Sequence, residues 1–498
     1  MITTLILFVI AIISVYFYIF KWKFKYWERH GIPHSKPVFP FGTIRIGDKL
    51  HLAQQMHQQY LKFKEKGPIF GGYRLLEPLL IIADPQIAKQ ILIKDFSSFH
   101  SRGLYENRKD DPMVSHLFIL SGQQWKRIRE KVTPVFTSGK IRGMTPTILA
   151  IAERLVDKIS SEIKIDSQID VKEWLARFTT DVIGSCAFGL ECNSIADPDA
   201  EFRKMGKILL KNVNFVKVFF GQNFPWFSKN ILHLTILTDQ IRNFFFNTVK
   251  QNVAYRQKNG SQRNDFLDLL IGLYNEKKTN DEKDWDLEGL SIYEIAAQCF
   301  VFFFAGFETS SSAISYTLLE LARNQDIQKE ARKHVKEVLK KHNGEMTYEM
   351  LQDLTYIDQC VFETLRMYPL APMLLRVANE NYRIPNTNYV IPKGQSVNIP
   401  IYSYQLDPDH FPDPEKYDPT RFASKESQHT QIYMPFGEGQ RICIGERFAK
   451  MTVKLALALL LMNFEFEFTP KTNYPPIYNT RLPLMSTKGE MFLGLKRL

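Results

Sequence analysis

The sequence is poor in cysteine and lacks the patterns that cysteines usually form. It contains five in 498 residues: Cys186, Cys192, Cys299, Cys360 and Cys443. An odd, sparse and scattered set argues against a disulfide framework and is typical of a reducing compartment. None belongs to a Cys-x-x-Cys pair or a Cys/His cluster, which argues against a structural zinc site.

Long basic blocks and internal repeats are also missing. The formal net charge of +11 suggests affinity for anionic surfaces, but no basic run is long enough to favour nucleic acid as a partner. At 498 residues the chain is longer than a domain built on one small hydrophobic core, yet no internal repeat and no second domain boundary is found. The sequence therefore predicts one large body.

Charge is absent from the first 20 residues, MITTLILFVIAIISVYFYIF. About 20 apolar residues span a hydrocarbon core of roughly 30 Å. A cleaved signal peptide would need a basic start, a shorter apolar core and small residues at the cleavage site, so we predict an uncleaved transmembrane anchor over residues 1–20. Lys21, Lys23, Lys25 and Arg29 follow it, and the positive-inside rule assigns that flank to the cytosol.

Proline interrupts the chain directly after the anchor. Pro33, Pro37 and Pro40 favour a stiff extended spacer, so we assign residues 21–42 to a basic, proline-rich hinge. The rest, residues 43–498, is predicted to be a single catalytic domain. Short strands are expected within residues 68–86, 382–398 and 464–498, and mostly helix over residues 84–341. The predicted fold class is mainly α with a minor β portion.

One long helix is predicted to cross this body. Ser291 and Glu294 form an S-x-x-E capping box that opens a helix running to about Arg323. Its centre, Cys299–Phe307, is apolar on every side and should be buried, and it is too short to be a second membrane span. Gly306 costs about 1 kcal/mol relative to alanine there. Either a flat group or a neighbouring helix approaches closely at this position.

One loop surrounds a single thiol with glycines and arginines. The segment PFGEGQRICIGERFAK, Pro435–Lys450, holds Cys443. A buried structural cysteine, a reactive nucleophile and a ligand to a bound group are the three interpretations. The loop by itself leaves the last two open.

Five motifs together resemble those of the cytochrome P-450 family. FGEGQRICIG, Phe436–Gly445, resembles the family's haem-binding loop F-x-x-G-x-R-x-C-x-G. The others are WKRIR (Trp125–Arg129), resembling the W-x-x-x-R helix, AGFETS (Ala305–Ser310), the oxygen-activation motif, ETLR (Glu363–Arg366), the E-x-x-R helix, and PTRF (Pro419–Phe422), the arginine loop that follows it. They stand in the family's order and, with the anchor and hinge, cover nearly the whole chain. Residues 178–198 and ETLRMYP are similar to insect microsomal enzymes of the xenobiotic-metabolising clan, its family six.

The resemblance implies a cytochrome P-450 fold that holds haem b. Cys443 would be the axial thiolate, which pushes electron density onto iron and favours O–O cleavage. Phe436 would shield the sulfur, and the backbone N–H groups of Gly439 and Gly445 would approach it. Ala305 and Gly306 would lie beside the ring. The residues that would bind the propionates are Trp125, Arg129, Arg376 and Arg441, with Arg102 a weaker candidate; singly, each arginine could be a surface charge.

The resemblance also assigns a proton relay and a structural ion network. Glu308 and Thr309 would deliver protons during dioxygen activation, although Thr309 could merely bond a carbonyl of its own helix. Glu363, Arg366 and Arg421 would form a buried network that supports folding and haem retention. In this sequence Thr420 stands at the position of the glutamate in the family's usual P-E-R-F motif.

The substrate and the electron donor are the least specified. Segments 100–117, 202–220, 300–309 and 370–377, with residues 484–485, would line a large apolar pocket, or they are plain core. No nicotinamide or flavin fingerprint occurs, so electrons must come from outside, from an NADPH–cytochrome reductase and, as a further candidate, a cytochrome b-type donor. A basic patch is expected to bind the reductase: Lys126, Arg127, Lys131, Arg447 and Lys450.

These features predict a monooxygenase in the endoplasmic reticulum membrane, facing the cytosol, that acts on lipophilic foreign compounds. Turnover of endogenous hormones or lipids is the alternative within that class. A haem sensor without turnover and a peroxide isomerase are alternatives from other classes, and the Glu308–Thr309 pair argues against both.

Overall fold

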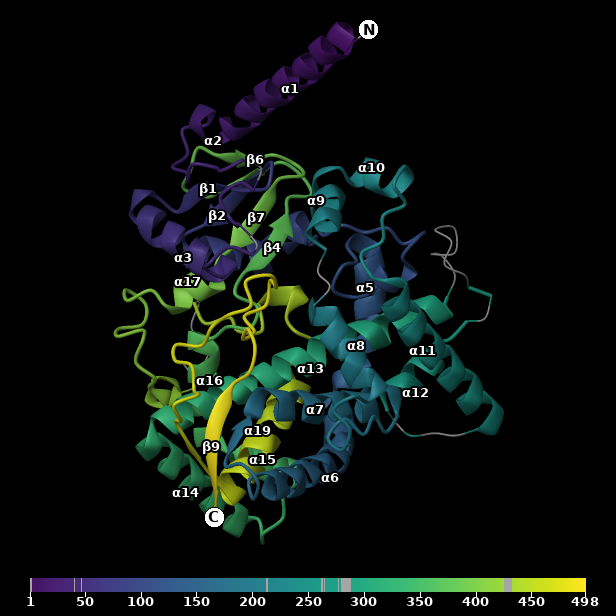
Figure 1. Ribbon diagram of the computed structural model, residues 1–498, viewed down its shortest axis with the longest axis vertical. Helices are drawn as coiled ribbons and strands as arrows, with labels where there is room; N and C mark the ends of the chain where they lie inside the picture. Colours follow the sequence, from purple (N-terminus) through teal and green to yellow (C-terminus); the bar gives the residue numbers. More distant parts are fainter. Residues whose placement is uncertain are drawn as a thin grey trace.

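The fold is mainly helical with small sheets, which confirms the predicted fold class. The computed structural model describes residues 2–39, 41–45, 47–211, 214–260, 263, 265–275, 277–278, 288–424 and 432–498. Figure 1 shows the first helix, α1 (Ile2–Phe24), projecting from one end of the molecule, with the largest sheet next to it and most helices beyond that sheet.

Helices fill most of the chain. The first half contains α2 (Tyr26–Arg29), α3 (Leu52–Phe63), α4 (Pro85–Lys89), α5 (Gly122–Val132), α6 (Ser138–Glu162), α7 (Val171–Ile183), α8 (Glu201–Lys211), α9 (Phe215–Asn223), α10 (Pro225–Asn230), α11 (Asp239–Asn259) and α12 (Phe266–Ile271). The second half contains α13 (Ile292–Arg323), α14 (Gln325–Lys341), α15 (Tyr348–Asp353), α16 (Thr355–Met367), α17 (Ile401–Gln405) and α19 (Glu446–Asn463).

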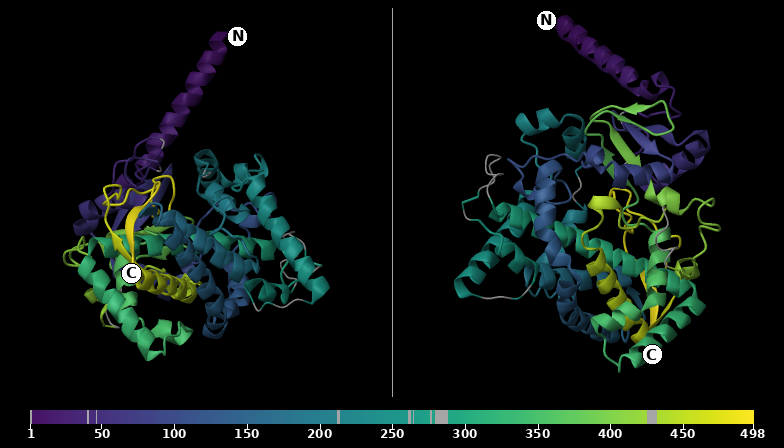
Figure 2. Two further views of the ribbon diagram at one scale, coloured as in Figure 1. Left: turned by 60° about the horizontal axis from the view of Figure 1, so that its bottom comes forward. Right: turned by 180° about the vertical axis from the view of Figure 1, so that it is seen from behind.

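Helix α13 begins at the predicted capping box and crosses the helical part of the molecule (Figures 1 and 2). Ser291 Oγ accepts a hydrogen bond from Glu294 N at 3.1 Å, and Glu294 Oε2 accepts one from Ser291 N at 2.8 Å. Helices α7, α11, α16 and α19 pack against it. Its apolar centre is mostly buried, as the sequence predicts, because helices cover it on several sides.

Three small sheets complete the architecture. In the largest, β1 (Ile69–Arg74) pairs antiparallel with β2 (Glu77–Ile82), β2 pairs parallel with β7 (Ser396–Ile399), and β7 pairs antiparallel with β4 (Leu374–Val377). A second sheet has the order β3 (Gln168–Asp170), β9 (Phe492–Arg497), β8 (Phe464–Glu467), and a third pairs β5 (Tyr382–Arg383) with β6 (Val390–Ile391). All three regions predicted to contain strands therefore do so.

In the part of the chain that the structure describes, two helices are long and apolar enough to cross a membrane, α1 and α13. The most apolar window of α1 has a mean hydropathy of 2.5 and none of it is buried. The corresponding window of α13 has a mean hydropathy of 1.2, and 61% of it is buried. Burial identifies α13 as a core helix, whereas α1 is left as the candidate anchor.

The segment predicted to be a hinge is docked on the body over much of its length. Helix α1 extends to Phe24, beyond the predicted boundary, and Trp27 in α2 is fully buried with its Nε1 donating to Gly72 O at 2.7 Å. His34 forms a β-bridge with Gly71. Pro40 lies outside the described residues. The basic part of the segment therefore attaches α1 to the edge of the largest sheet.

Candidate active site

Cys443 lies in a loop that leads from Phe436 into α19, with its backbone N–H bonded to Phe436 O at 2.9 Å. Its side chain is exposed, whereas the other four cysteines are buried. Burial nevertheless raises the pKa of the Cys443 thiol, and the Gly445 N–H opposes that shift. The thiol is therefore accessible although protein atoms lie close around it. An accessible thiol in an enclosed loop suits a ligand better than a structural cysteine.

Gly439 in this loop is required for a different reason than predicted. Its φ of +72° is in the left-handed region, and a Cβ there would overlap Leu92 O. Leu92 belongs to the helical turn η2 (Gln90–Lys94), which packs against η9 (Gly439–Arg441). Glycine thus allows the loop to approach the backbone of η2, and of the two predicted glycines it is Gly445 whose N–H influences the sulfur.

Four arginines that are far apart in the sequence gather around the same site. They are Arg102, Arg129, Arg376 and Arg441. Burial, followed by the charges of the other three, lowers the pKa of Arg441 to about 8. Burial lowers that of Arg102 to about 9, with Arg376 and Arg129 adding to the effect and Cys443 opposing it. Within the described residues, none of the four forms an ion pair with a carboxylate. A cluster of this kind is stabilised by an anionic group that lies between the guanidinium groups.

Individual contacts show how the cluster is held. Arg441 Nη2 donates to Leu120 O at 2.5 Å, and Arg102 Nη1 donates to Phe118 O at 2.7 Å. Arg376, on β4, is 2% exposed. The Nε atoms of Arg376 and Arg441 are buried and have no hydrogen-bond partner among the described residues. Arg102, which the sequence made a weaker candidate, is a member of the cluster.

Trp125 supports the cluster through Arg441. Its ring lies 4.5 Å from the Arg441 guanidinium carbon in a cation–π contact and packs against Phe96 at 5.5 Å. Arg129, one turn later in α5, is half-buried. The predicted W-x-x-x-R pair is therefore brought to the site, with Trp125 stacked on an arginine from a distant loop.

A window in the middle of α13 is accessible, although the helix is buried on both sides of it. Ala305 is exposed, and Gly306 and Thr309 are partly exposed. Thr309 Oγ1 donates to Ala305 O at 2.6 Å, which is the bond within the helix that the sequence left as an alternative. A Cβ on Gly306 would overlap Ile183 Cδ1 of α7. Close packing against α7 therefore accounts for glycine at position 306, and the place of Gly306 beside a ring stays a prediction.

Glu308 is a buried acid next to this window. It is 2% exposed, and its Oε1 has no hydrogen-bond partner among the described side chains and backbone groups. Burial raises the pKa of Glu308, while the positive charges of Lys172 and Arg203 oppose the shift. A carboxyl group with a raised pKa that is not locked in an ion pair can take up and release a proton.

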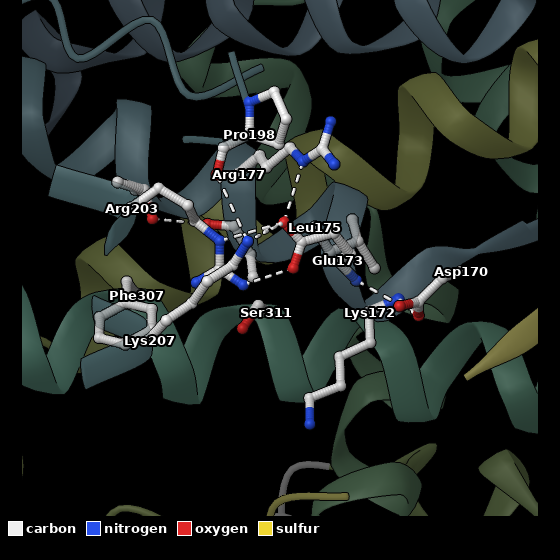
Figure 3. Close-up of polar contacts among 12 residues, drawn as sticks. Asp170, Lys172, Glu173, Leu175, Arg177, Pro198, Arg203, Lys207, Phe307 and Ser311 are labelled. Atoms are coloured by element: carbon white, nitrogen blue, oxygen red, sulfur yellow. Dashed lines mark hydrogen bonds and ion pairs between the residues drawn. The ribbon is translucent and has the colours of Figure 1, made fainter. Parts of the chain in front are cut away.

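Cations from α7 and α8 lie next to α13 at this point, as Figure 3 shows. Glu173 pairs with Arg203 at 2.7 Å, Arg177 at 3.0 Å and Lys207 at 3.3 Å, and hydrogen bonds from arginine help to lower its pKa to about 2. Lys172 points away from this cluster in Figure 3, and its Nζ donates to Thr487 O at 2.6 Å. The sequence prediction missed this network. Only the i,i+4 spacing of Glu173 and Arg177 could have indicated it.

The side chains of Arg366 and Arg421 both lie within ion-pair distance of Glu363, as the sequence predicts. Arg366 Nε lies 2.7 Å from Glu363 Oε2, and both residues are fully buried. Arg421 Nε lies 3.4 Å from Glu363 Oε1. Arg366 also donates to Gln405 O at 2.9 Å, so the pair fastens α16 to the C-terminal end of α17.

The residues predicted to contact substrate are divided by the structure. Phe300, Phe303 and Phe307 are buried in the aromatic core between α13, α11 and α8, and Met485 is fully buried. For these side chains the core interpretation holds. Residues 212–213 of the predicted segment 202–220 lie outside the described part of the chain.

The chain is similar to known proteins over nearly its whole length. The sequence model of the family described as "Cytochrome P450" matches residues 35–493. "Probable cytochrome P450 6a14" of Drosophila melanogaster is 42% identical over 489 residues, which cover 95% of this chain and 96% of the relative. "Cytochrome P450 6A1" of Musca domestica is 38% identical over 499 residues, 98% of this chain and 97% of the relative. The chain belongs to the cytochrome P-450 family of haem-dependent monooxygenases.

Proposed function

We propose that this chain is a membrane-bound haem-thiolate monooxygenase that inserts one oxygen atom of dioxygen into lipophilic foreign compounds, with NADPH as the electron source through a reductase. Family membership supports a monooxygenase over a haem sensor or a peroxide isomerase. The observation that carries the proposal is the accessible thiol of Cys443 next to four arginines that pair with no carboxylate in the described chain.

Haem b fits these residues. Its two propionates carry the negative charge that Arg102, Arg129, Arg376 and Arg441 together would compensate. Cys443 would bind the haem iron through its sulfur, and the Gly445 N–H and the N-terminus of α19 would favour the thiolate form of Cys443. The bound haem supplies the activation of dioxygen.

The remaining chemistry belongs to the protein. Glu308 would hold a proton in a site that is almost closed to water, and Thr309 would pass it on from the accessible window of α13. In its present rotamer the Thr309 hydroxyl gives its proton to Ala305 O. Rotation of the side chain, or a water accepted by its lone pairs, would therefore precede proton delivery.

A membrane position is supported by two apolar surfaces. Helix α1 is exposed along its length, and α10 and its flanks carry exposed apolar side chains: Phe224, Trp226, Phe227, Ile231 and Leu232. Trp226 is 69% exposed. Figures 1 and 2 show α10 at the same end of the molecule as α1. We propose that both face the bilayer of the endoplasmic reticulum, with the catalytic domain in the cytosol.

The experiment that tests the function is a reduced carbon monoxide difference spectrum followed by turnover. With haem, reductant and carbon monoxide, we expect an absorption band at about 450 nm, the signature of thiolate ligation. The variant Cys443→Ser should lose the band, and Cys299→Ser, which changes a buried cysteine, should keep it. A band typical of histidine ligation would contradict the proposal. Incubation of a panel of foreign and endogenous lipophilic compounds with reductase and NADPH then separates detoxification from hormone or lipid turnover.

A further inference from the structure

Two stacked tyrosines and a buried carboxylate lie next to the candidate active site without a role in the proposed reaction. The rings of Tyr316, on α13, and Tyr368, after α16, stack with centroids 4.7 Å apart and an interplanar angle of 14°. The Tyr368 hydroxyl donates to Glu320 Oε1 at 2.5 Å. Glu320 is fully buried, Tyr316 is 1% exposed and Tyr368 is 5% exposed.

The inner end of this group is close to the active site. Tyr316 follows Glu308 on α13 by eight residues, about 12 Å along the helix axis. Burial raises the pKa of Tyr316, and the charge of Glu308 adds to the shift, so the two groups are within electrostatic reach. The Tyr316 hydroxyl donates to Met485 O at 3.0 Å, a carbonyl that cannot take up a proton.

The outer end reaches the surface through Tyr474. Arg323 Nη1 donates to the Tyr474 hydroxyl at 2.6 Å, and its guanidinium carbon lies 4.2 Å from the Tyr474 ring centroid. The charges of Glu320, Tyr474 and Tyr478 all influence the pKa of Tyr368. Tyr474 is partly exposed. The tyrosines therefore extend from beside α13 to solvent.

Core packing explains the two stacked tyrosine rings, but it does not explain the buried carboxylate of Glu320. Two stacked rings fill a core equally well as phenylalanines, whereas a buried carboxylate carries a large desolvation cost. Glu320 meets Arg323 only at 3.9 Å, so a close ion pair does not offset that cost. Its shortest contact is with the hydroxyl of Tyr368, which is the arrangement that a phenol needs to lose an electron and a proton together.

We propose that Tyr316, Tyr368 and Tyr474 form a path that carries single electrons from the surface to the active site, and that Glu320 is the proton acceptor of Tyr368. The path rests on the proposed haem function. It would protect the protein when peroxide oxidises the haem site and no substrate consumes the oxidising equivalent.

Each electron that passes along the tyrosines is accompanied by the transfer of a proton. Tyr368 gives one electron inward through Tyr316, and its phenolic proton moves to Glu320 Oε1, which leaves a neutral tyrosyl radical and a neutral carboxylic acid. Tyr474 then returns an electron to Tyr368 and releases its phenolic proton to solvent, while Glu320 returns its proton to Tyr368. A soluble hydrogen-atom donor such as ascorbate restores Tyr474. Two such passages, with two protons, reduce one molecule of hydrogen peroxide to two molecules of water and oxidise two molecules of ascorbate by one electron each.

The test is rapid freeze-quench electron paramagnetic resonance of the haem-loaded protein mixed with hydrogen peroxide. We expect a tyrosyl signal in the unchanged protein that falls by at least half in Tyr368→Phe and in Glu320→Gln. The matched control is Tyr433→Phe, a buried tyrosine that donates to the backbone carbonyl of Phe362 at 3.0 Å, and it should keep the full signal. Haem bleaching by peroxide should be severalfold faster in Tyr368→Phe than in the control.

Equal signals and equal bleaching rates in Tyr368→Phe and Tyr433→Phe would overturn the path. If both variants keep the band near about 450 nm, only the path is overturned. An unchanged protein that lacks this band overturns the proposed function as well.

Tyr474→Phe provides a second test at a partly exposed position, where folding is not at risk. With a spin trap and peptide mass spectrometry, we expect an adduct on Tyr474 in the unchanged protein, and a tyrosyl signal that decays more slowly in Tyr474→Phe when ascorbate is present. No adduct on Tyr474, together with identical decay in both proteins, would overturn the path.

Discussion

At the scale of single residues, the site is defined by charges whose partners are missing from the protein itself. Arg102, Arg376 and Arg441 form no ion pair with a carboxylate in the described chain, and burial lowers the pKa of each guanidinium. The contrast with Arg366 is direct, because Arg366 is equally buried but has Glu363 at 2.7 Å. One arginine set supports the fold, and the other is prepared for an anionic group.

The ion pair at Glu363 predicts a large loss of stability. Glu363→Gln leaves Arg366 buried without a counter-charge, and we expect the free energy of unfolding to fall by about 3–5 kcal/mol. Glu349→Gln is the matched control, because Glu349 pairs with Arg142 at 2.8 Å in an exposed position and should cost at most about 1 kcal/mol. Denaturant titration measures both variants, and similar losses would contradict the structural role of the network.

Glu308 predicts a stability that depends on pH. Burial raises its pKa in the folded protein, so the folded state binds a proton more tightly than the unfolded state. Stability therefore falls as the pH rises from the unfolded-state pKa of about 4.3 through the folded-state pKa. Glu308→Gln stays neutral and should melt at a higher temperature than the unchanged protein at pH 8, and at the same temperature near pH 4. A difference that does not vary with pH would contradict this, and turnover should fall in the variant at either pH.

At the scale of elements, close approaches between distant segments determine where glycine is needed. Gly306 lets α13 approach Ile183 of α7, and Gly439 lets the cysteine loop approach Leu92 of η2. One contact positions the accessible window of α13, and the other positions the loop of Cys443. Both glycines lie in sequence motifs, and packing between elements is by itself enough to require glycine at each position.

The Gly306 contact is tested by a compensating pair. Gly306→Ala gains helix propensity but places a methyl group on Ile183 Cδ1, so we expect a net loss of about 1–3 kcal/mol from overpacking. In the background Ile183→Ala the same change should be neutral or stabilising. Thermal unfolding of the four proteins gives the coupling energy, and a coupling near zero would return Gly306 to a role at the ring.

At the scale of the whole molecule, apolar and charged surfaces indicate the environment. Helix α1 and the surface around α10 lie at one end, and the sequence places the basic patch for the reductase on α5 and α19. In the structure, some of the positive charges of this patch are already paired with carboxylates of the protein. Arg127 pairs with Glu294, Lys450 pairs with Glu446 at 2.6 Å, and Lys126 is exposed.

The apolar end predicts two contributions to membrane binding. Deletion of residues 2–24 should lower flotation with phospholipid vesicles, and the further change of Trp226 and Phe227 to serine should lower the remaining binding severalfold. Ile165→Ser is the control, since Ile165 is 86% exposed and follows α6, away from α10. Equal residual binding with and without the serine changes would contradict a role for α10.

The revised patch predicts which charges matter for electron transfer. Lys126→Gln together with Lys131→Gln should slow reduction by the NADPH–cytochrome reductase at low salt and weaken its salt dependence. Arg127 should matter less for docking, because its charge is already paired inside the protein. Lys329→Gln with Lys333→Gln on α14 is the control pair, and reduction rates that match it would show that the patch is misplaced.

The sequence by itself determined the elements and the chemistry of the residues. The capping box of α13, the strand regions, the apolar α1 and the spacing of Glu363 and Arg366 depend on neighbours a few residues apart, so local patterns were enough. Only the tertiary structure decided which distant groups meet. The joining of Arg102 to Arg376 and Arg441, the stacking of Trp125 on Arg441, and the contact of Gly306 with Ile183 depend on how separate elements pack, and no local spacing encodes that packing.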